Sequence, residues 1–435
     1  MKIWMLAGAA CAALNVLCLP ASAAIPTTAA AAPAYTAGAD QAVNAFYARR
    51  SGAPLWLRAG PDSTAAQAMI PILERAPLDG FASGPALAAR ASGLIANARA
   101  GDPTALAAAD RLLSTAWVLY VQALHRAPAG MAMADGWSAP RVESGQQILA
   151  RAAAAQSPAA HVRTVSNVNP VYAQLRDAAW QQAQASGGAL DPRVAASLDR
   201  ARIAPFQKRY VMVDAASARL YMIEDGRIAD SMRVIVGKPS APTPMLASTI
   251  YYATVNPYWH VTSELVRDLI APNVLEQGMG YLNSRGYQVF TSYGDDAERL
   301  PPESVDWKAV AAGRETVEVR QLPGPANSMG EVKFGFANKY DIYLHDTPNK
   351  GVFAADDRDI SHGCIRLEDA AQLERWLLGR EAAASDVPEQ HVPLPTPVPI
   401  YITYLTAHSD GGQLSFVDDI YGRDRAAASQ VAALR

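Results

Sequence analysis

The interpretation of this 435-residue sequence rests on two segments, IYLHDTP at residues 342–348 and SHGCIR at residues 361–366. They place two histidines, His345 and His362, upstream of Cys364. A cysteine becomes a nucleophile when a neighbouring group favours its thiolate, and an imidazole within hydrogen-bond reach does this. The glycine before the cysteine permits a tight turn and leaves room for a substrate. The pattern therefore indicates a cysteine nucleophile rather than a buried structural thiol.

The first residues have the pattern of a secretory leader. Lys2 precedes an apolar run from Ile3 to Leu19, and small residues then offer an Ala-x-Ala cleavage site after Ala23. This charged, apolar and small-residue order is typical of a signal peptide and too short to span a bilayer comfortably. We therefore predict a signal peptide at residues 1–23 and an exported protein. A retained membrane anchor is the alternative.

Cysteine usage supports a functional thiol. Cys11 and Cys18 both fall inside the leader, where lipidation is a minor alternative, and the mature chain then holds Cys364 alone. One cysteine excludes an intramolecular disulfide, so an exported chain has either buried this thiol or uses it. No other long apolar segment follows the leader, and we expect no stable membrane span once it is removed.

Composition narrows the function classes. The formal net charge of −3 argues against a nucleic-acid-binding surface, which is normally basic. The sequence contains no metal-ligand cluster, P-loop or dinucleotide fingerprint, so neither a metal nor a cofactor is expected. Asp214, Asp225 and the pair Asp356–Asp357 lie in turn-like settings and are interpreted as surface turns.

The mature chain divides into regions of different texture. An Ala/Thr/Pro-rich stretch at residues 24–39 predicts a flexible linker. Residues 40–205 are Ala-rich and predict a helical domain, with one helix over Ala105–Leu124 and another starting near Asn169. The aromatic residues of this part are predicted to lie in its core; they are Trp117, Tyr120 and Trp180.

The texture changes to β-branched and aromatic runs at Arg209. Short turns between such runs predict antiparallel hairpins. The predicted strands are residues 210–213, 219–223, 231–237, 248–256, 317–321, 332–336 and 341–345, with a closing β segment at 393–405 and a helix at 367–378. An insertion at about residues 258–312 carries a helical stretch, Thr262–Gln277. Residues 409–435 are predicted to be a C-terminal tail, its last 15 or so residues mobile.

The two histidine and cysteine segments resemble the L,D-transpeptidase family of bacterial cell-wall enzymes, whose signature is an upstream His followed by S-H-G-C-[IV]-R. VNPYW at 255–259, RQLPGP at 320–325 and VKF at 332–334 resemble the large Gram-negative branch of that family. The resemblance implies an α+β chain with a helical scaffold domain at 40–205. It further implies a mostly β, YkuD-type catalytic domain at 206–408, with a mobile helical lid inserted, and a periplasmic location.

The resemblance also implies roles for individual residues. Cys364 is the expected nucleophile and His345 the expected general base and acid, oriented by Asp346 or by a backbone carbonyl. His362 and Gly363 are expected to line an oxyanion pocket with the Cys364 N–H. The remaining candidates would hold a substrate carboxylate, brace the loop or shape the pocket; they are Arg366, Ser361, Arg358 and Tyr343.

The expected substrate is the peptidoglycan stem peptide. Cys364 would attack the L-centre carbonyl of the third stem residue, expel the terminal D-Ala and pass the acyl group to an amine, which gives a 3→3 cross-link. Hydrolysis of the acyl-enzyme, lipoprotein anchoring and a silent wall-binding module are the alternatives. Papain-like peptidases do not fit, because both motif histidines precede Cys364. Carbapenems are the expected inhibitors.

Overall fold

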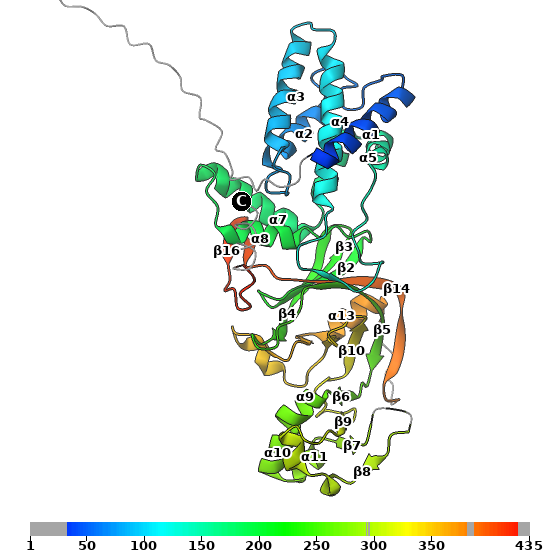
Figure 1. Ribbon diagram of the computed structural model, residues 1–435, viewed down its shortest axis with the longest axis vertical. Helices are drawn as coiled ribbons and strands as arrows, with labels where there is room; N and C mark the ends of the chain where they lie inside the picture. The colour runs from blue at the N-terminus through cyan, green and yellow to red at the C-terminus, as the bar shows by residue number, and fades with distance from the viewer. Residues whose placement is uncertain (1–32, 293, 295, 381–386, 425–435) are drawn as a thin grey trace, which may run out of the picture.

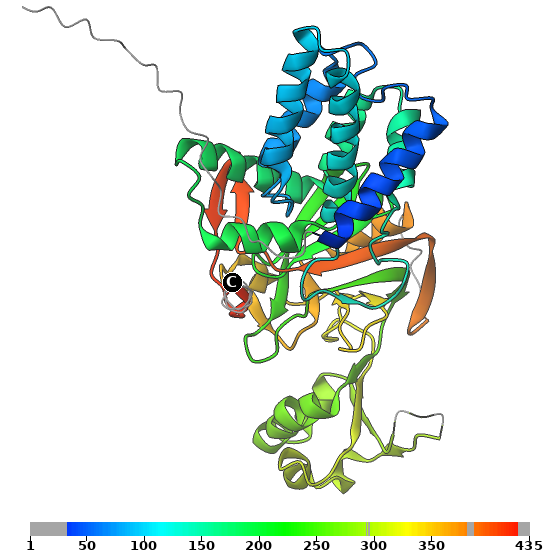
Figure 2. The ribbon, with the colours of Figure 1, turned by 45° about the horizontal axis from the view of Figure 1, so that its top comes forward.

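The computed structural model describes residues 33–292, 294, 296–380 and 387–424, and these form three parts. A helical part lies at one end, a mixed sheet in the middle and a small inserted part at the other end (Figures 1 and 2). The predicted signal peptide and the first part of the predicted linker lie outside the described residues, as do residues 425–435 of the predicted tail. Among the described residues, no helix combines the length and apolar character that a membrane crossing requires.

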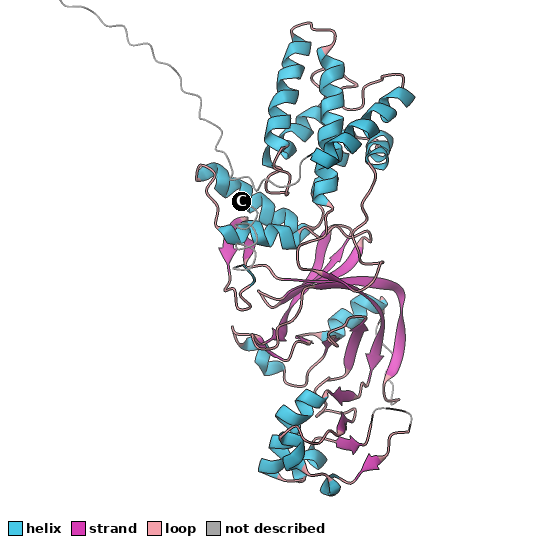
Figure 3. Cartoon of the chain, in the orientation of Figure 1, coloured by secondary structure: helices cyan, strands magenta, loops and turns pink. Residues whose placement is uncertain are grey.

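The N-terminal part is helical, as predicted (Figure 3). Its helices are α1 (Pro33–Arg49), α2 (Thr64–Arg75), α3 (Gly84–Arg99), α4 (Ala105–Leu124), α5 (Gly145–Ala154), α6 (Pro158–Ser166), α7 (Pro170–Ala185) and α8 (Pro192–Ala201). Trp117 and Tyr120 are fully buried in its core and Trp180 packs against it, which confirms the predicted core aromatics.

Two helix starts follow from local chemistry, and one boundary differs from the prediction. The Asp102 side chain accepts the backbone N–H of Thr104 before α4, and Asn169 accepts the N–H of Tyr172 as the N-cap of α7. The predicted linker at 24–39 is wrong at its C-terminal end, because α1 already begins at Pro33. Alanine has the highest helix propensity, so an Ala-rich stretch next to a docked helix extends it.

A buried carboxylate organises this helical core. Asp110 on α4 is 1% exposed and accepts the backbone N–H groups of Leu55, Trp56 and Leu57, each at 2.7 Å. The hydroxyl of Tyr47 on α1 also donates to it. These bonds satisfy polar groups of a buried loop that no helix or strand pairs. A single side chain therefore ties α1 and the α1–α2 loop to α4.

The central sheet contains most of the predicted strands. It is built from β1 (Ala132–Met133), β2 (Arg209–Asp214), β3 (Arg219–Glu224), β4 (Arg227–Gly237), β5 (Leu246–Val255), β10 (Val332–Phe336), β11 (Leu344–His345), β12 (Asp359–Ser361), β13 (Ile365–Leu367) and β14 (Gln390–Thr403). The order is β1-β5-β10-β11-β13-β4-β3-β2-β14, and β12 pairs with β4. Because β14 also pairs with β5, the path of strands closes on itself.

Two details of this sheet differ from the predictions. The predicted helix at 367–378 begins only at α13 (Ala370–Leu378), because β13 occupies the residues before it and Asp369 caps the helix. Asp214, interpreted as a surface turn, is 1% exposed. Its carboxylate accepts the N–H of Leu405 and the hydroxyl of Ser217, so it stays buried by satisfying neighbouring donors.

The insertion forms a small part with its own sheet and core. Its strands are β6 (Trp259–Val261), β7 (Tyr287–Phe290), β8 (Arg299–Leu300) and β9 (Glu318–Gln321), in the order β6-β9-β7-β8. Its helices are α9 (Ser263–Leu265), the π-helix η1 (Val266–Ile270), α10 (Ala271–Gln277), α11 (Gly280–Ser284), η2 (Pro302–Ser304) and α12 (Trp307–Ala311). The predicted helical stretch is confirmed. The strand predicted at 317–321 exists, but it pairs inside the insertion and not with the central sheet.

The chain after residue 406 is folded rather than a simple tail. β15 (Ala407–Asp410) and β16 (Gln413–Phe416) form a hairpin that lies against α7 (Figure 1). Farther on, Arg200 of α8 forms an ion pair with Asp424 at 2.5 Å. The prediction of a tail from residue 409 is therefore wrong up to residue 424. Its contacts are made to residues about 200 positions earlier, which local sequence patterns do not reveal.

Candidate functional site

Cys364 lies in a tight turn between β12 and β13. Gly363 has a φ of +112°, a conformation that favours glycine. The Ser361 hydroxyl donates to the Cys364 carbonyl at 2.6 Å and accepts the Gly363 N–H at 3.1 Å. Ser361 therefore braces the turn. Because the Gly363 N–H is engaged there, the predicted oxyanion donors reduce to the Cys364 N–H and the His362 ring.

His345 is brought to this turn by strand pairing. β11 and β13 are parallel neighbours, with Leu344 opposite Ile365 and His345 opposite Arg366. The N–H of Ile365, the residue after the nucleophile, donates to the Tyr343 carbonyl at 3.0 Å. His345 is 3% exposed. The sheet thus buries His345 on the strand beside the one that follows Cys364.

A backbone carbonyl, and not a carboxylate, contacts the far side of the His345 ring. Nδ1 of His345 lies 2.6 Å from the carbonyl oxygen of Asp346. The Asp346 carboxylate is occupied elsewhere, because it accepts the Lys350 ammonium at 2.5 Å and the Glu331 N–H at 3.0 Å. Of the two orienting groups left open by the sequence, the geometry selects the carbonyl. The Nδ1 proton then leaves Nε2 free to act as a base.

Burial favours the neutral form of both the His345 ring and the Cys364 thiol. It lowers the pKa of His345 to about 3, and the charge of Arg366 acts in the same direction. Burial also raises the pKa of the Cys364 thiol, against hydrogen bonds from Tyr343 and the charge of Arg366. The half-buried thiol points toward the Asp341 carbonyl at 3.9 Å.

The remaining predicted residues separate into two groups. Arg366 is half-buried and close enough to Cys364 to affect its pKa, and the Tyr343 ring meets the His345 ring edge-on at 5.7 Å. Arg358 instead donates to the carbonyls of Ala355 and Ser217, so it braces the chain before β12. Arg366 and Tyr343 therefore lie close to Cys364 and His345, whereas the hydrogen bonds of Arg358 go to backbone carbonyls before β12 and in the β2–β3 turn.

Sequence reasoning missed the loop between β4 and β5. The Lys238 ammonium lies 3.1 Å from Nε2 of His362, and the Thr243 hydroxyl donates to the Gly363 carbonyl at 2.8 Å. Tyr421 donates its hydroxyl to the Gly237 carbonyl at 2.5 Å and so ties the C-terminal segment to this loop. The available signal was Lys238, which directly follows the strand predicted at residues 231–237.

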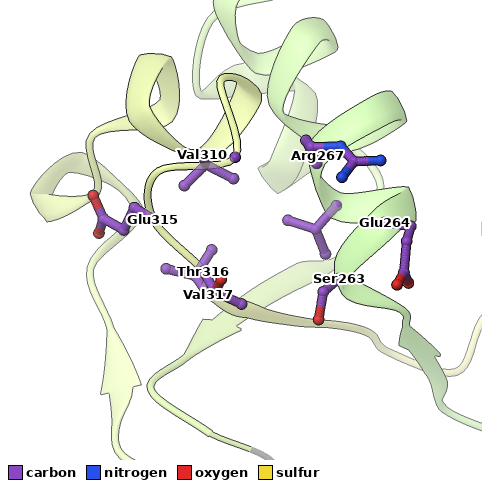
Figure 4. Close-up of a pocket in the computed structure, with 9 residues that line it drawn as sticks. Ser263, Glu264, Arg267, Val310, Glu315, Thr316 and Val317 are labelled. Carbon is purple, nitrogen blue, oxygen red and sulfur yellow. The ribbon is translucent and has the colours of Figure 1, made fainter.

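The insertion faces the same turn and contains a pocket of its own. Asp268 on η1 is close enough to His362 and Lys238 for their charges to lower its pKa, after the larger effect of its hydrogen bond from Arg267. A pocket of about 110 Å³ lies between α9, η1, α12 and the approach to β9 (Figure 4). It is lined by Ser263, Glu264, Val266, Arg267, Val310, Gly313, Glu315, Thr316 and Val317. The predicted site residues do not line it.

Comparison with protein families agrees with this division. Residues 208–400 match the model described as the L,D-transpeptidase catalytic domain, YkuD, and residues 41–178 match the model described as a Scaffold domain. A curated protein of Haemophilus influenzae named "Putative L,D-transpeptidase" is 30% identical over 242 residues. The alignment covers 54% of this chain and 48% of that protein, so the chain spans about half the length of the curated relative it matches.

Solved structures of similar proteins are more distant. An L,D-transpeptidase from Mycobacterium smegmatis is 15% identical with a TM-score of 0.22, over 45% of this chain and 58% of that chain. L,D-transpeptidase 3 from Mycobacterium tuberculosis is 13% identical with a TM-score of 0.23, over 45% of this chain and 60% of that chain. Scores this low add nothing to what the family models establish.

Proposed function

We propose that this chain is an exported, periplasmic peptidoglycan L,D-transpeptidase. It carries an L,D-transpeptidase catalytic domain at residues 208–400, preceded by a Scaffold domain at residues 41–178. The observation that carries the proposal is the pairing of β11 with β13. It brings His345, with its Nδ1 on a carbonyl oxygen, to the strand that follows Cys364. The stem tetrapeptide is the proposed acyl donor and an amine of a second stem the proposed acceptor.

The first half of the reaction forms an acyl-enzyme. Nε2 of His345 takes the thiol proton as Sγ of Cys364 attacks the L-centre carbonyl of the third stem residue. The developing oxyanion is held by the Cys364 N–H and the His362 ring. The amide bond to the terminal D-Ala then breaks, and its nitrogen leaves with the proton returned by His345. A thioester on Cys364 and free D-Ala result.

The second half transfers the acyl group. The amine of the acceptor attacks the thioester carbonyl and gives its proton to His345. The C–S bond breaks, and the sulfur recovers a proton from His345, so the resting thiol and imidazole are restored. Water in place of the amine gives the tripeptide, and a lipoprotein amine gives an anchored protein.

Defined substrates separate these outcomes. The purified chain is incubated with disaccharide-tetrapeptides and the products are identified by mass spectrometry. A cross-linked dimer with release of D-Ala supports the transpeptidase, whereas tripeptide alone supports a carboxypeptidase. No product from a folded sample supports the silent binding module.

Variants of the two reacting residues control the assay. Cys364→Ser should fold and lose nearly all turnover, because a hydroxyl is a far weaker nucleophile. His345→Ala should lower acylation by at least about 100-fold, the usual contribution of general acid–base catalysis. His362→Ala should retain slow acylation. Appreciable turnover by Cys364→Ser contradicts the proposal.

Inhibition by a carbapenem tests the same thiol independently. A strained lactam carbonyl should acylate Cys364 and add a covalent mass to the peptide that contains it. The adduct should be absent in Cys364→Ser. A sample that processes tetrapeptide but forms no adduct would show that the surroundings of Cys364, such as the insertion, exclude the drug. A folded sample that neither processes tetrapeptide nor forms the adduct would support the silent wall-binding module.

A further inference from the structure

Lys238 joins the loop after β4 to the turn that carries Cys364 at two points, and a third hydrogen bond holds it within its own loop. Its backbone N–H donates to the Ser361 carbonyl at 2.9 Å, and its carbonyl accepts the Ala241 N–H at 2.8 Å. Its ammonium nitrogen lies 3.1 Å from Nε2 of His362. Because the backbone of this half-buried residue is held on both sides, its side chain is aimed at the His362 ring.

The backbone beside Lys238 makes a tight turn that several hydrogen bonds hold in place. A Cβ on the neighbouring Gly237 would lie 2.1 Å from the Ala241 carbonyl oxygen, so the backbone turns back on itself there. The Thr243 hydroxyl accepts the Gly237 N–H at 2.9 Å and donates to Gly363. The Tyr421 hydroxyl closes the other side of the turn. The backbone that carries Lys238 is therefore hydrogen-bonded directly to the turn that contains Cys364.

In the contact between Lys238 and His362, the lysine ammonium must be the donor and the imidazole nitrogen the acceptor. An ammonium group carries three donors and no acceptor, so the nitrogen it meets must carry a lone pair. That nitrogen is Nε2, and the proton of the neutral ring then resides on Nδ1. In water neutral histidine favours the opposite tautomer, with its proton on Nε2. The lysine thus selects the less common form.

The charges around His362 keep the ring neutral. Burial lowers its pKa, and the charges of Lys238 and Arg366 lower it further, while Asp268 on the insertion acts in the opposite direction. These groups face the ring from the β4–β5 loop, from β13 and from η1 respectively. Two cations against one exposed carboxylate favour the unprotonated ring.

We infer that Lys238 is a positioning residue that holds His362 in the Nδ1–H tautomer, so that Nδ1–H is the one hydrogen-bond donor left on this ring, two residues before Cys364. The use of this donor on an oxyanion rests on the proposed function. The tautomer itself does not. Neither the family match nor the sequence motifs assign a role to Lys238.

Nuclear magnetic resonance of the full chain with labelled histidines tests the tautomer directly. The His362 signals are assigned with His362→Gln, and the ring nitrogen and Cδ2 shifts then report which nitrogen carries the proton. We expect Nδ1–H in the wild type, Nε2–H in Lys238→Met and recovery of Nδ1–H in Lys238→Arg. Lys208→Met, which removes an exposed lysine paired with Asp225, should leave the wild-type signals.

Acylation by a carbapenem gives the second readout. Lys238→Met should acylate about 10- to 100-fold more slowly, somewhat less than the loss of a whole oxyanion donor, and Lys238→Arg should recover most of the rate. A wild-type His362 with its proton on Nε2, or an unchanged tautomer in Lys238→Met, overturns the inference. A changed tautomer with an unchanged rate overturns the positioning role.

Failure of the proposed function would give a different set of results from failure of the inference about Lys238. A wild-type chain that shows Nδ1–H on His362, loses it in Lys238→Met and yet neither turns over tetrapeptide nor reacts with the drug would refute the proposed enzyme. It would still support the contact between Lys238 and His362. The resonance measurement and the turnover assay therefore fail independently.

Discussion

The hydroxyl of Thr243 donates a hydrogen bond of 2.8 Å to the carbonyl oxygen of Gly363, the residue before Cys364. The same hydroxyl accepts the N–H of Gly237, and Thr243 is fully buried. One side chain from the β4–β5 loop thus satisfies two buried backbone groups, the Gly237 N–H and the Gly363 carbonyl. Thr243 and Gly363 are 120 residues apart in the sequence. The geometry of the nucleophile depends on this loop as well as on its own motif.

Removing that hydroxyl should loosen the nucleophile turn. Thr243→Val keeps the side-chain shape but leaves a buried carbonyl and a buried N–H unsatisfied, which costs roughly 1–3 kcal/mol for each group. We expect faster amide hydrogen exchange in the peptides of β12 and β13, and slower carbapenem acylation. Thr243→Ser retains the hydroxyl and serves as the matched control. Equal exchange in the valine and serine variants would contradict the role of this bond.

Because a backbone carbonyl contacts Nδ1 of His345, we expect the Asp346 side chain to be dispensable for the proposed reaction. Asp346→Asn should keep the acylation rate within about threefold of the wild type, because the backbone carbonyl remains in place. Lys350→Met removes the same ion pair from its other end and should have a similarly small effect. Were the carboxylate the orienting group, its replacement by an amide would be expected to lower turnover by orders of magnitude.

The buried neutral His345 should make the catalytic sheet sensitive to acid. Its folded-state pKa of about 3 lies below the ordinary histidine value, so at intermediate pH the unfolded chain binds a proton that the folded chain does not. Stability is therefore lost as pH falls from about 6.5 toward 3, with a slope approaching about 1.4 kcal/mol per pH unit from this group.

Hydrogen exchange of β4 and β13 at two acidities measures this contribution. Between pH 7 and pH 5, the loss of protection in the wild type should exceed that in His345→Gln by roughly 1–2 kcal/mol. Between pH 7 and pH 8 the two proteins should change alike, because neither state then holds the extra proton. If wild type and His345→Gln lost the same protection between pH 7 and pH 5, His345 would be protonated in the folded state as readily as in the unfolded state, which contradicts the prediction.

The Asp110 carboxylate should be essential for the helical part. Asp110→Ala leaves the N–H groups of Leu55, Trp56 and Leu57 buried without an acceptor, at a total cost of at least about 3 kcal/mol. We expect loss of exchange protection across α1 and α4, with the catalytic sheet still protected. Asp40→Asn, a change at an exposed residue of α1, should stay within about 0.5 kcal/mol. A helical part of normal stability in Asp110→Ala would contradict the assignment.

Local patterns in the sequence were sufficient to predict most of the helices and strands and to place Cys364 and its two histidines in one motif. The start signal at Asp102-Pro103-Thr104 placed α4 at its observed bounds, and the hairpins from Arg209 onward contain the predicted strands. Cys364 and its two histidines lie within a span of 20 residues, so a contiguous motif contains the chemistry. These features depend on neighbours in the chain, whose geometry the backbone fixes.

Only the tertiary structure decided which side chains, backbone groups and strands contact one another. It selected the Asp346 carbonyl for His345, assigned β9 to the insertion and brought Lys238 to His362 across 124 residues of sequence. It also buried Asp214 and folded the chain after residue 406 against the helices. Such contacts depend on how separate elements dock and on which buried polar groups find partners, and no local propensity encodes either outcome.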